Sequence, residues 1–181
     1  MRKLIITEFM TLDGVIEASD KWSIQYWNEA ISNFKREEVF SADSFVLGRV
    51  TYDGFSKAWP TMEGTGDFGE RMNSLPKYVA SKTLKQEDMI WNANVMSDDV
   101  VEKINELKNQ QGMNILVAGS PDFAQTLIKE KLVDEFWLLV YPVTLGQGKK
   151  LFQDGAETKL QLLETKDMGS GVVLIKYATI V

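Results

Sequence analysis

The sequence contains neither cysteine nor histidine in 181 residues, and these two absences exclude more chemistry than any motif does. Without them the chain can form no thiolate nucleophile, disulfide, Cys/His zinc site or iron–sulfur cluster. Ser-His-Asp and Cys-His catalysis are excluded as well. Any acid–base step must therefore use a carboxyl group, tyrosine, lysine or water, because the usual side chain for proton transfer near neutral pH is missing. Chemistry supplied by an organic cofactor stays open.

Long apolar runs and an excess of positive charge are also missing. The longest apolar run, residues 136–143, is far shorter than the roughly 20 residues that a membrane span needs. The formal net charge of −6 argues against a general binder of nucleic acid or anionic membranes. The charged first residues and the short apolar segment after them do not fit a secretory signal. We therefore expect a cytoplasmic protein whose partner is a small molecule, with no nucleic acid, no membrane and no metal.

What is present is the composition of an ordinary globular protein, with 44% apolar and 25% charged residues. No repeat or linker divides the chain, so we expect one domain over residues 1–181. Helical periodicity marks a first helix through Trp27, Ala30, Ile31, Phe34 and Val39. A second well-marked helix runs over 98–109 with Ser97 as its expected N-cap, and a third over 121–130.

Strands are expected between these helices and at the end of the chain. Short apolar segments predict strands at 4–9, 44–47, 77–81, 115–118 and 136–141. Residues 160–165 and 172–180 are typical of a final antiparallel pair around Gly169-Ser170-Gly171. Strands that alternate with helices and then follow one another alone predict an α/β fold with a mostly parallel sheet and an antiparallel C-terminal edge.

Three strand ends carry residues suited to phosphate. Gly48-Arg49-Val50-Thr51 leads from a strand into an expected helix, where backbone N–H groups, the Arg49 guanidinium and the Thr51 hydroxyl would meet an anion. Gly119 and Ser120, before Pro121, form a second such helix start. Ser81 and Lys82 would suit the 2′-phosphate that separates NADPH from NADH. Each segment also has a structural interpretation, as a plain turn, a helix start or a polar strand exit.

A fourth segment, Gly146-Gln147-Gly148-Lys149-Lys150-Leu151, is similar to a dinucleotide fingerprint without matching it. The third glycine of G-x-G-x-x-G is replaced by Leu151. The segment is not a Walker A loop either, because Lys149 is followed by Lys150 and the leading glycine is missing. The motif alone is therefore weak evidence for nucleotide binding.

Taken in order, the segments resemble a known family. Met10-Thr11-Leu12-Asp13-Gly14, Gly48-Arg49-Val50-Thr51-Tyr52, Pro76-Lys77-Tyr78-Val79-Ala80-Ser81, Gly119-Ser120 and Pro142-Val143-Thr144-Leu145-Gly146-Gln147-Gly148 follow one another as in the RibD C-terminal-domain-like proteins, a dihydrofolate reductase-like family in the broad sense. The resemblance runs over about residues 2–180. It implies a three-layer α/β/α fold, with NADPH lying across the carboxyl ends of the strands, and a homodimer.

The resemblance also implies roles for individual residues. Gly48, Arg49 and Thr51 would meet the phosphates or the adenosine end of NADPH, and Ser81 and Lys82 its 2′-phosphate. Gly119 and Ser120 would lie at the pyrophosphate. The nicotinamide and substrate would lie beside Thr11 and Gly14 on one loop and beside Thr144, Gly146 and Gly148 on another.

Two departures from the family bear on the activity. Dihydrofolate reductases use a carboxylate on the first helix, and here Glu29 and Glu37 are the options, with Glu37 expected closer to the apolar face. Asp13 is an alternative source of a proton. The deaminase half of the bifunctional riboflavin enzymes is excluded because its zinc signature needs histidine or cysteine.

The leading hypothesis is thus a free-standing NADPH-dependent reductase that transfers hydride to a small heterocycle or a ribosylamino-pyrimidine. Its activity would be similar to that of the 5-amino-6-(5-phosphoribosylamino)uracil reductase of riboflavin biosynthesis rather than to dihydrofolate reduction. A non-catalytic NADPH- or pterin-binding module is the alternative. A third hypothesis is a structural protein whose strand at 172–180 pairs across a dimer.

Overall fold

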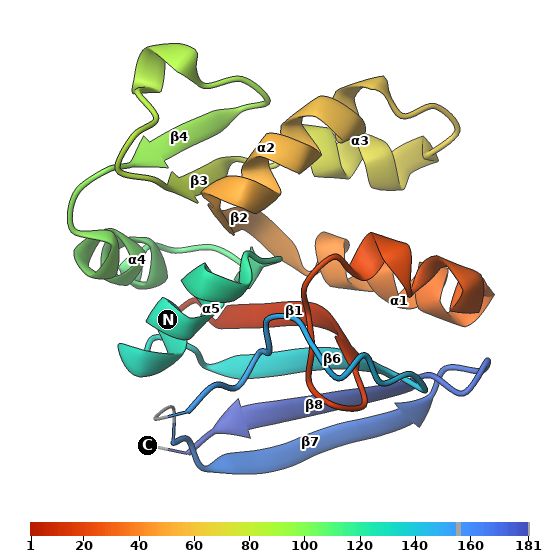
Figure 1. Cartoon of the computed structure of the whole chain (residues 1–181). Helices are drawn as coiled ribbons and strands as arrows, with labels where there is room; N and C mark the ends of the chain where they lie inside the picture. Colours follow the sequence, from red (N-terminus) through yellow and green to blue (C-terminus); the bar gives the residue numbers. More distant parts are fainter. Residues whose placement is uncertain (155–156, 181) are drawn as a thin grey trace.

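One eight-stranded sheet organises the molecule, for which the computed structural model describes residues 1–154 and 157–180 (Figure 1). The strands lie in the order β4-β3-β2-β5-β1-β6-β8-β7. Their bounds are β1 Leu4–Thr11, β2 Ala42–Gly48, β3 Lys77–Ala80, β4 Ala93–Met96, β5 Asn114–Val117, β6 Glu135–Tyr141, β7 Leu160–Asp167 and β8 Val173–Thr179. Strands β1 to β6 are parallel, and β8 runs antiparallel to both β6 and β7.

Five α-helices in the described part of the chain cover the two faces of this sheet (Figure 1). They are α1 Glu29–Phe40, α2 Arg49–Ala58, α3 Gly66–Ser74, α4 Val100–Asn109 and α5 Pro121–Lys129. The first three share buried contacts with one face, and α4 and α5 with the other. No helix among residues 1–154 and 157–180 is long and apolar enough to cross a membrane. The expected α/β/α architecture with an antiparallel edge is confirmed.

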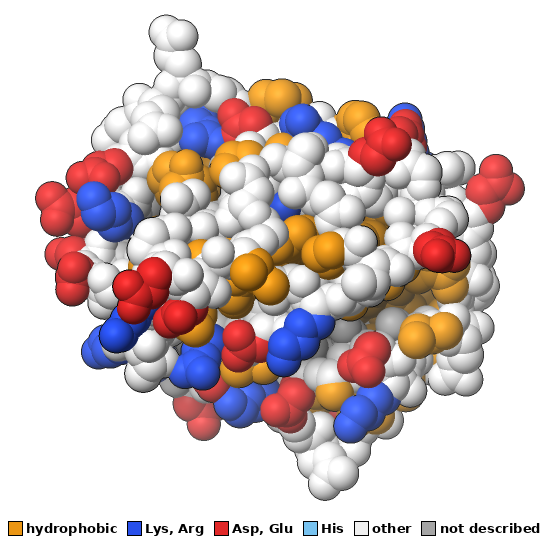
Figure 2. All heavy atoms as spheres, turned by 90° about the horizontal axis from the view of Figure 1, so that it is seen from above, with side chains coloured by type: hydrophobic (Ala, Val, Ile, Leu, Met, Phe, Trp, Pro, Cys, Tyr) orange, Lys and Arg blue, Asp and Glu red, His pale blue; other side chains and the backbone are white. Residues whose placement is uncertain are grey.

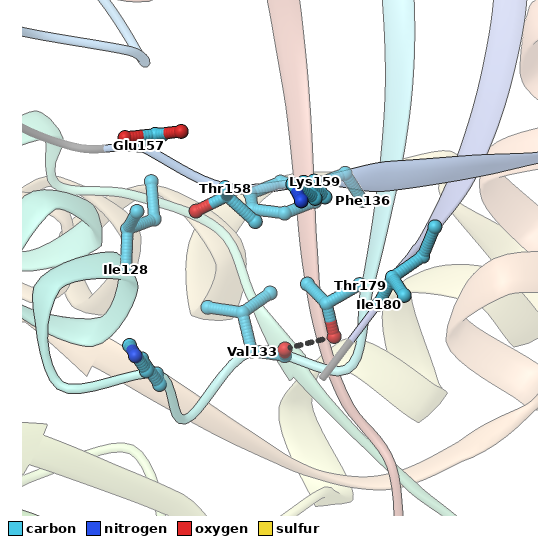
Figure 3. Close-up of a pocket in the computed structure, with 9 residues that line it drawn as sticks. Ile128, Val133, Phe136, Glu157, Thr158, Lys159, Thr179 and Ile180 are labelled. Atoms are coloured by element: carbon cyan, nitrogen blue, oxygen red, sulfur yellow. Dashed lines mark hydrogen bonds between the residues drawn. The ribbon is translucent and has the colours of Figure 1, made fainter.

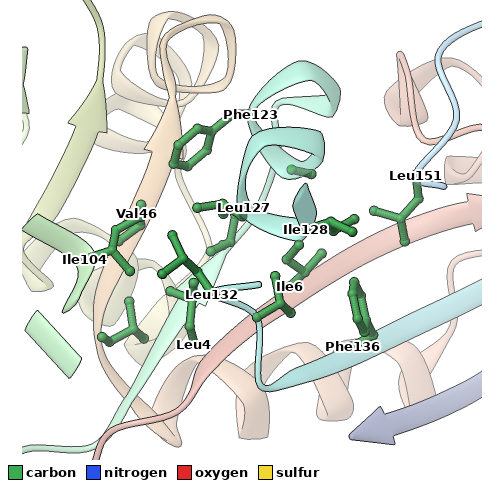
Figure 4. Close-up of a cluster of buried hydrophobic side chains, with 14 of the residues drawn as sticks. Leu4, Ile6, Val46, Ile104, Phe123, Leu127, Ile128, Leu132, Phe136 and Leu151 are labelled. Carbon is green, nitrogen blue, oxygen red and sulfur yellow. The ribbon is translucent and has the colours of Figure 1, made fainter. Parts of the chain in front are cut away.

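The central strand β1 explains how both layers are held. Leu4 and Ile6 point to the α4/α5 side, where they pack with Ile104 and Leu127 (Figure 4). Ile5 points to the opposite face and packs with residues of α1, α2 and α3. Because a strand buried on both faces cannot alternate polar with apolar residues, β1 begins as a continuous apolar run. Each fully buried aliphatic side chain contributes about 1.5–3 kcal/mol.

Helix starts differ in a way that matters for the site. The Asn28 side chain caps α1 by accepting the N–H of Ile31 at 3.0 Å, and Asp99 caps α4 by accepting the N–H of Glu102 at 3.0 Å. The expectation that Ser97 caps α4 is wrong, because the helix begins at Val100 and the residue next to it supplies the carboxylate. Neither α2 nor α5 has a side-chain cap within the described residues.

The edge of the sheet also differs from the expectation. The pair 160–165 and 172–180 does form an antiparallel hairpin, but β8 lies between β6 and β7. The free edge at this end of the sheet is therefore β7, so the hypothesis that the strand at 172–180 is an edge that pairs across a dimer is wrong. Leu162 and Leu163 on β7 are 53% and 49% exposed.

Candidate functional site

The loops named from the sequence all open at the carboxyl edge of the parallel strands. Thr11 ends β1, Gly48 ends β2 and Ser81 follows β3. Gly119 follows β5, and Thr144 follows β6. Because parallel strands end at the same edge, five segments far apart in the sequence meet on one side of the molecule.

Gly48, Thr51, Gly119 and Ser120 touch one another, and we call this group the two-turn cradle. The backbone N–H of Gly48 donates to the carbonyl oxygen of Gly119 at 3.1 Å. A Cβ at Gly48 would lie 2.4 Å from the Ser120 Oγ, and one at Gly119, whose φ is +80°, would lie 2.5 Å from the Thr51 Oγ1. Only glycine permits this approach of the two turns. The structure thus brings together four of the residues expected at the phosphates.

The cradle joins two uncapped helix N-termini. Helix α2 starts after Gly48 and α5 after Ser120, and in the described part of the chain neither start is closed by a side chain. First-turn N–H groups have no intrahelical partner, and with the helix dipole they favour an anion. The one acidic residue in these first turns, Asp122, is exposed and pairs with Lys149 at 2.5 Å. The electrostatics of the cradle therefore favour a phosphate.

Arg49 and the end of β3 extend the cradle to one side. The Arg49 guanidinium donates to the Thr83 hydroxyl and lies 3.4 Å from the Asp53 Oδ2. The Ser81 Oγ accepts the N–H of Thr83 at 3.2 Å and of Leu84 at 3.1 Å, so it shapes the turn. Lys82 is exposed beside it. Thr83 was not singled out in the sequence, although its hydroxyl next to Ser81 and Lys82 was a usable signal.

Asp13 fastens two loops on the other side of the edge. Its carboxylate accepts the Thr11 hydroxyl at 2.6 Å, the N–H of Gly146 at 2.8 Å and the N–H of Leu145 at 3.2 Å. These hydrogen bonds, with the Thr11 hydroxyl first, lower the pKa of Asp13 to about 2. An ionised carboxylate with both oxygens engaged is a poor proton donor. The geometry therefore favours anchoring of the loops over the catalytic role expected for Asp13.

The segment at 146–151 joins this side to the cradle. The N–H of Ile16 donates to the Lys149 carbonyl oxygen at 3.0 Å, and a Cβ at Gly148 would come within 2.8 Å of the Val15 Cγ1. The Gln125 side chain of α5 donates to the carbonyl oxygen of Leu151. The segment that is similar to a dinucleotide fingerprint is thus a loop packed between the first turn and α5. Thr144, expected at the pocket, is exposed.

The carboxylate that α1 turns inward is Glu38. Glu29 and Glu37 are both exposed, whereas Glu38 is 2% exposed. Its oxygens contact Lys35 and the Thr7 hydroxyl of β1. The expectation that Glu37 lies toward the apolar face is wrong, because Glu38, four residues after Phe34, takes the inner position.

An aromatic cluster lies beside Thr11 at the carboxyl edge. Tyr141, opposite Thr11 in the sheet, lies with its ring 5.4–5.7 Å from those of Phe9, Trp22 and Tyr26. Its hydroxyl is buried and has no hydrogen-bond partner among the described residues. Burial raises the pKa of this phenol. The cluster offers an apolar wall with one unused polar atom.

A separate pocket of about 210 Å³ lies at the opposite edge, where β6 begins and β8 ends (Figure 3). Its lining includes Ile128, Val133, Phe136, Thr158, Lys159, Thr179 and Ile180. None of the residues expected at the site belongs to it. The chemistry-bearing residues meet at the carboxyl edge, so we place the candidate site there. Within residues 1–154 and 157–180 no cluster of three or more acidic side chains could hold a metal ion.

Fold and edge together define the class of protein. The molecule has the dihydrofolate reductase-like fold: the dihydrofolate reductase of Enterococcus faecalis, solved with NADP(H), superposes with a TM-score of 0.65 at 15% identity, covering 99% of this chain and 97% of that one. A proposed riboflavin biosynthesis protein from Shewanella sp. PV-4 superposes with a TM-score of 0.79 at 20% identity, covering 99% of both chains.

The sequence comparisons then give the family. The RibD C-terminal domain model matches residues 2–174. Protein YyaP of Bacillus subtilis (strain 168) is 32% identical over 183 aligned residues, which cover 97% of this chain and 94% of that protein. The chain belongs to the RibD C-terminal domain family.

Proposed function

We propose that the protein is an NADPH-dependent reductase whose cofactor binds across the carboxyl edge. The observation that carries this is the two-turn cradle, where two uncapped helix N-termini meet with no room for a side chain at Gly48. Such a pair of N-termini suits the two phosphates of a dinucleotide better than a single anion. Membership of the RibD C-terminal domain family supports the proposal.

The residues present fit this cofactor. Gly119 and Ser120 would hold one part of the pyrophosphate, and Gly48 with Thr51 the other. Arg49, held against Thr83, would meet the adenosine end with Ser81 and Lys82 at the 2′-phosphate. Hydride transfer itself would be supplied by the nicotinamide.

A small acceptor fits better than a polymer. On the face in Figure 2, basic and acidic side chains are interspersed around hydrophobic ones, which does not favour a polyanion. Beside the cradle, Asp13 fixes the two loops and Tyr141 contributes an aromatic wall. This chain's residues would bind and orient the acceptor and exclude water. We propose a small heterocycle or a ribosylamino-pyrimidine as the substrate.

Substrate-dependent oxidation of NADPH tests the proposal. Pteridines and ribosylaminopyrimidines are offered in turn, and the loss of NADPH absorbance is followed against a reaction without acceptor. Turnover with any of them supports the reductase. Failure of the protein to bind NADPH at all would contradict the whole proposal.

A non-catalytic NADPH- or pterin-binding module is the second candidate. It is favoured by the state of Asp13 and Glu38, because both carboxylates are held by hydrogen bonds or an ion pair. Saturable NADPH binding with no turnover across the acceptor panel would select this module.

A further inference from the structure

Glu8 is a charged residue type in the middle of a central strand. It lies on β1, which pairs with β5 on one side and β6 on the other. The side chain points to the same face as Ile6, toward α5, because side chains alternate along a strand. The register Ile6↔Val117, continued by two residues, brings Glu8 next to Gly119. Glu8 therefore lies beneath one turn of the two-turn cradle.

One oxygen of the Glu8 carboxyl group lacks the partner that an ionised group needs. The Oε1 atom is buried and makes no hydrogen bond to any residue the structure describes, although the side chain as a whole is half-buried. A buried carboxylate without a partner is strongly disfavoured, and such a group neutralises instead. On the other face of β1, by contrast, Glu38 has both Lys35 and Thr7. Glu8 was not among the predicted site residues, although a glutamate that follows a buried apolar run marks the position in the sequence.

We propose that Glu8 is a positioning residue of the cofactor site, a neutral carboxylic acid that supports the Gly119–Ser120 turn and whose ionisation expels the pyrophosphate. The inference rests on the proposed binding of NADPH. Two negative groups in a site of low dielectric repel strongly, so a diphosphate at this turn and an ionised Glu8 exclude each other. Cofactor affinity then depends on the proton of Glu8.

The surroundings of Glu8 support a shift of its pKa into the physiological range. Burial raises the pKa of Glu8 to about 8; Lys35 and the N–H of Gly119 oppose the rise, and Glu38 adds to it. Other charges on the neighbouring elements are engaged elsewhere. At the start of α5, Asp122 pairs with Lys149, and at the start of α2, Arg49 lies 3.4 Å from Asp53. At the far end of the sheet, Glu135 pairs with Lys3, and Asp134 pairs with Lys108.

Calorimetric titration of NADPH between pH 6.5 and 9.5 tests the proposal on the full chain. Wild type should bind about tenfold more weakly at pH 9 than at pH 7, and at pH 9 binding should take up ~1 proton per site, measured in buffers of different ionisation enthalpy. Glu8→Gln keeps the neutral shape and should bind with no proton uptake and less than about twofold change across the range. Glu130→Gln, an exposed glutamate after α5, is the matched control and should behave as wild type.

The outcomes separate this inference from the proposed function. NADPH binding that is independent of pH in wild type, or that changes in parallel in wild type and Glu8→Gln, overturns the role of Glu8 and leaves NADPH binding intact. No NADPH binding at any pH overturns both. If circular dichroism shows that Glu8→Gln fails to fold, the pH profile and the proton uptake of the wild type still decide whether Glu8 controls NADPH binding.

Discussion

Two glutamates on opposite sides of β1 show how neighbours set the state of a carboxyl group. Glu38 is buried but has Lys35 and Thr7, so its charge is balanced where it lies. The Oε1 atom of Glu8 has no hydrogen-bond partner in the described residues, and burial raises the pKa of Glu8 to about 8. The same residue type is thus fully engaged on one face and has an unpartnered oxygen on the other.

Replacement of Glu8 by Gln should make the stability of the protein less dependent on pH. Because the folded pKa is raised from 4.5 to about 8, the native state binds more protons than the unfolded state between these values. Wild-type stability therefore falls as the pH rises from about 4.5 to 8. The Tm of Glu8→Gln relative to wild type should rise on the order of 5 °C between pH 5 and pH 8.5. A constant difference in Tm across this range would contradict the raised pKa.

Asp13→Asn should loosen the two substrate-side loops. The carboxylate accepts three hydrogen bonds with two oxygens, and an amide offers one oxygen only. We expect a lower Tm and faster amide hydrogen exchange at Leu145 and Gly146, whereas Asp20→Asn, an exposed control, should change neither. Because the pKa of Asp13 is lowered to about 2, the contribution of Asp13 to the stability of the fold is present above pH 4 and is lost as the pH falls through 2. Unchanged exchange at both amides would refute the anchoring role.

At the scale of elements, the strand ends were predictable because glycine and proline punctuate them. Gly48 and Ser120-Pro121 marked two helix starts that the structure contains. Helix α3 and strand β4 were not predicted. The helix has a glycine at its first position, Gly66, and another inside it, Gly69, which costs about 1 kcal/mol of helix propensity. Packing of Met72 into the core compensates for this, and no local pattern reveals such a contact.

Gly48→Ala and Gly54→Ala form a matched pair that tests the cradle. At Gly48 the new methyl group would meet Ser120, forcing the turns apart, so NADPH affinity should fall by at least about tenfold and stability by ~1–3 kcal/mol. At Gly54, inside α2, no atom lies within 4 Å of the new Cβ, so stability should rise by about 0.5–1 kcal/mol with NADPH affinity unchanged. The measurements are NADPH titration and urea unfolding. Equal effects of the two variants on NADPH affinity would show that the cradle is not the binding site.

At the scale of the whole molecule, the order of short motifs predicted which loops meet, because parallel strands bring their carboxyl ends together. The inward glutamate could not be predicted, since Glu37 and Glu38 follow Phe34 by three and four residues and both spacings lie on one helix face. The true position depends on where α1 begins, and that is fixed by Asn28. The position of β8 between β6 and β7 was also unpredictable, because either strand of the final hairpin could have paired with β6.

The homodimer expected from the family resemblance stays a prediction. Strand β7 is the free edge on the antiparallel side of the sheet and exposes Leu162 and Leu163, so we expect the dimer contact there. Analytical ultracentrifugation should give twice the 20.5 kDa mass of the chain. Leu162→Lys should shift the protein toward the monomer, and Met113→Lys, at an exposed apolar residue near β5, should not. A wild-type monomer at micromolar concentration would contradict the prediction.

The carboxyl edge is proposed to bind NADPH through the two-turn cradle and to select it by the 2′-phosphate. The most direct measurement is a titration of the wild-type protein with NADPH and NADH in parallel, followed by quenching of its five tryptophans. We expect saturable binding of NADPH at one site per chain, at least about tenfold tighter than NADH, which corresponds to ~1.4 kcal/mol. Equal affinity for the two nucleotides would contradict the selection by phosphate, and absence of NADPH binding at millimolar concentration would contradict the site itself.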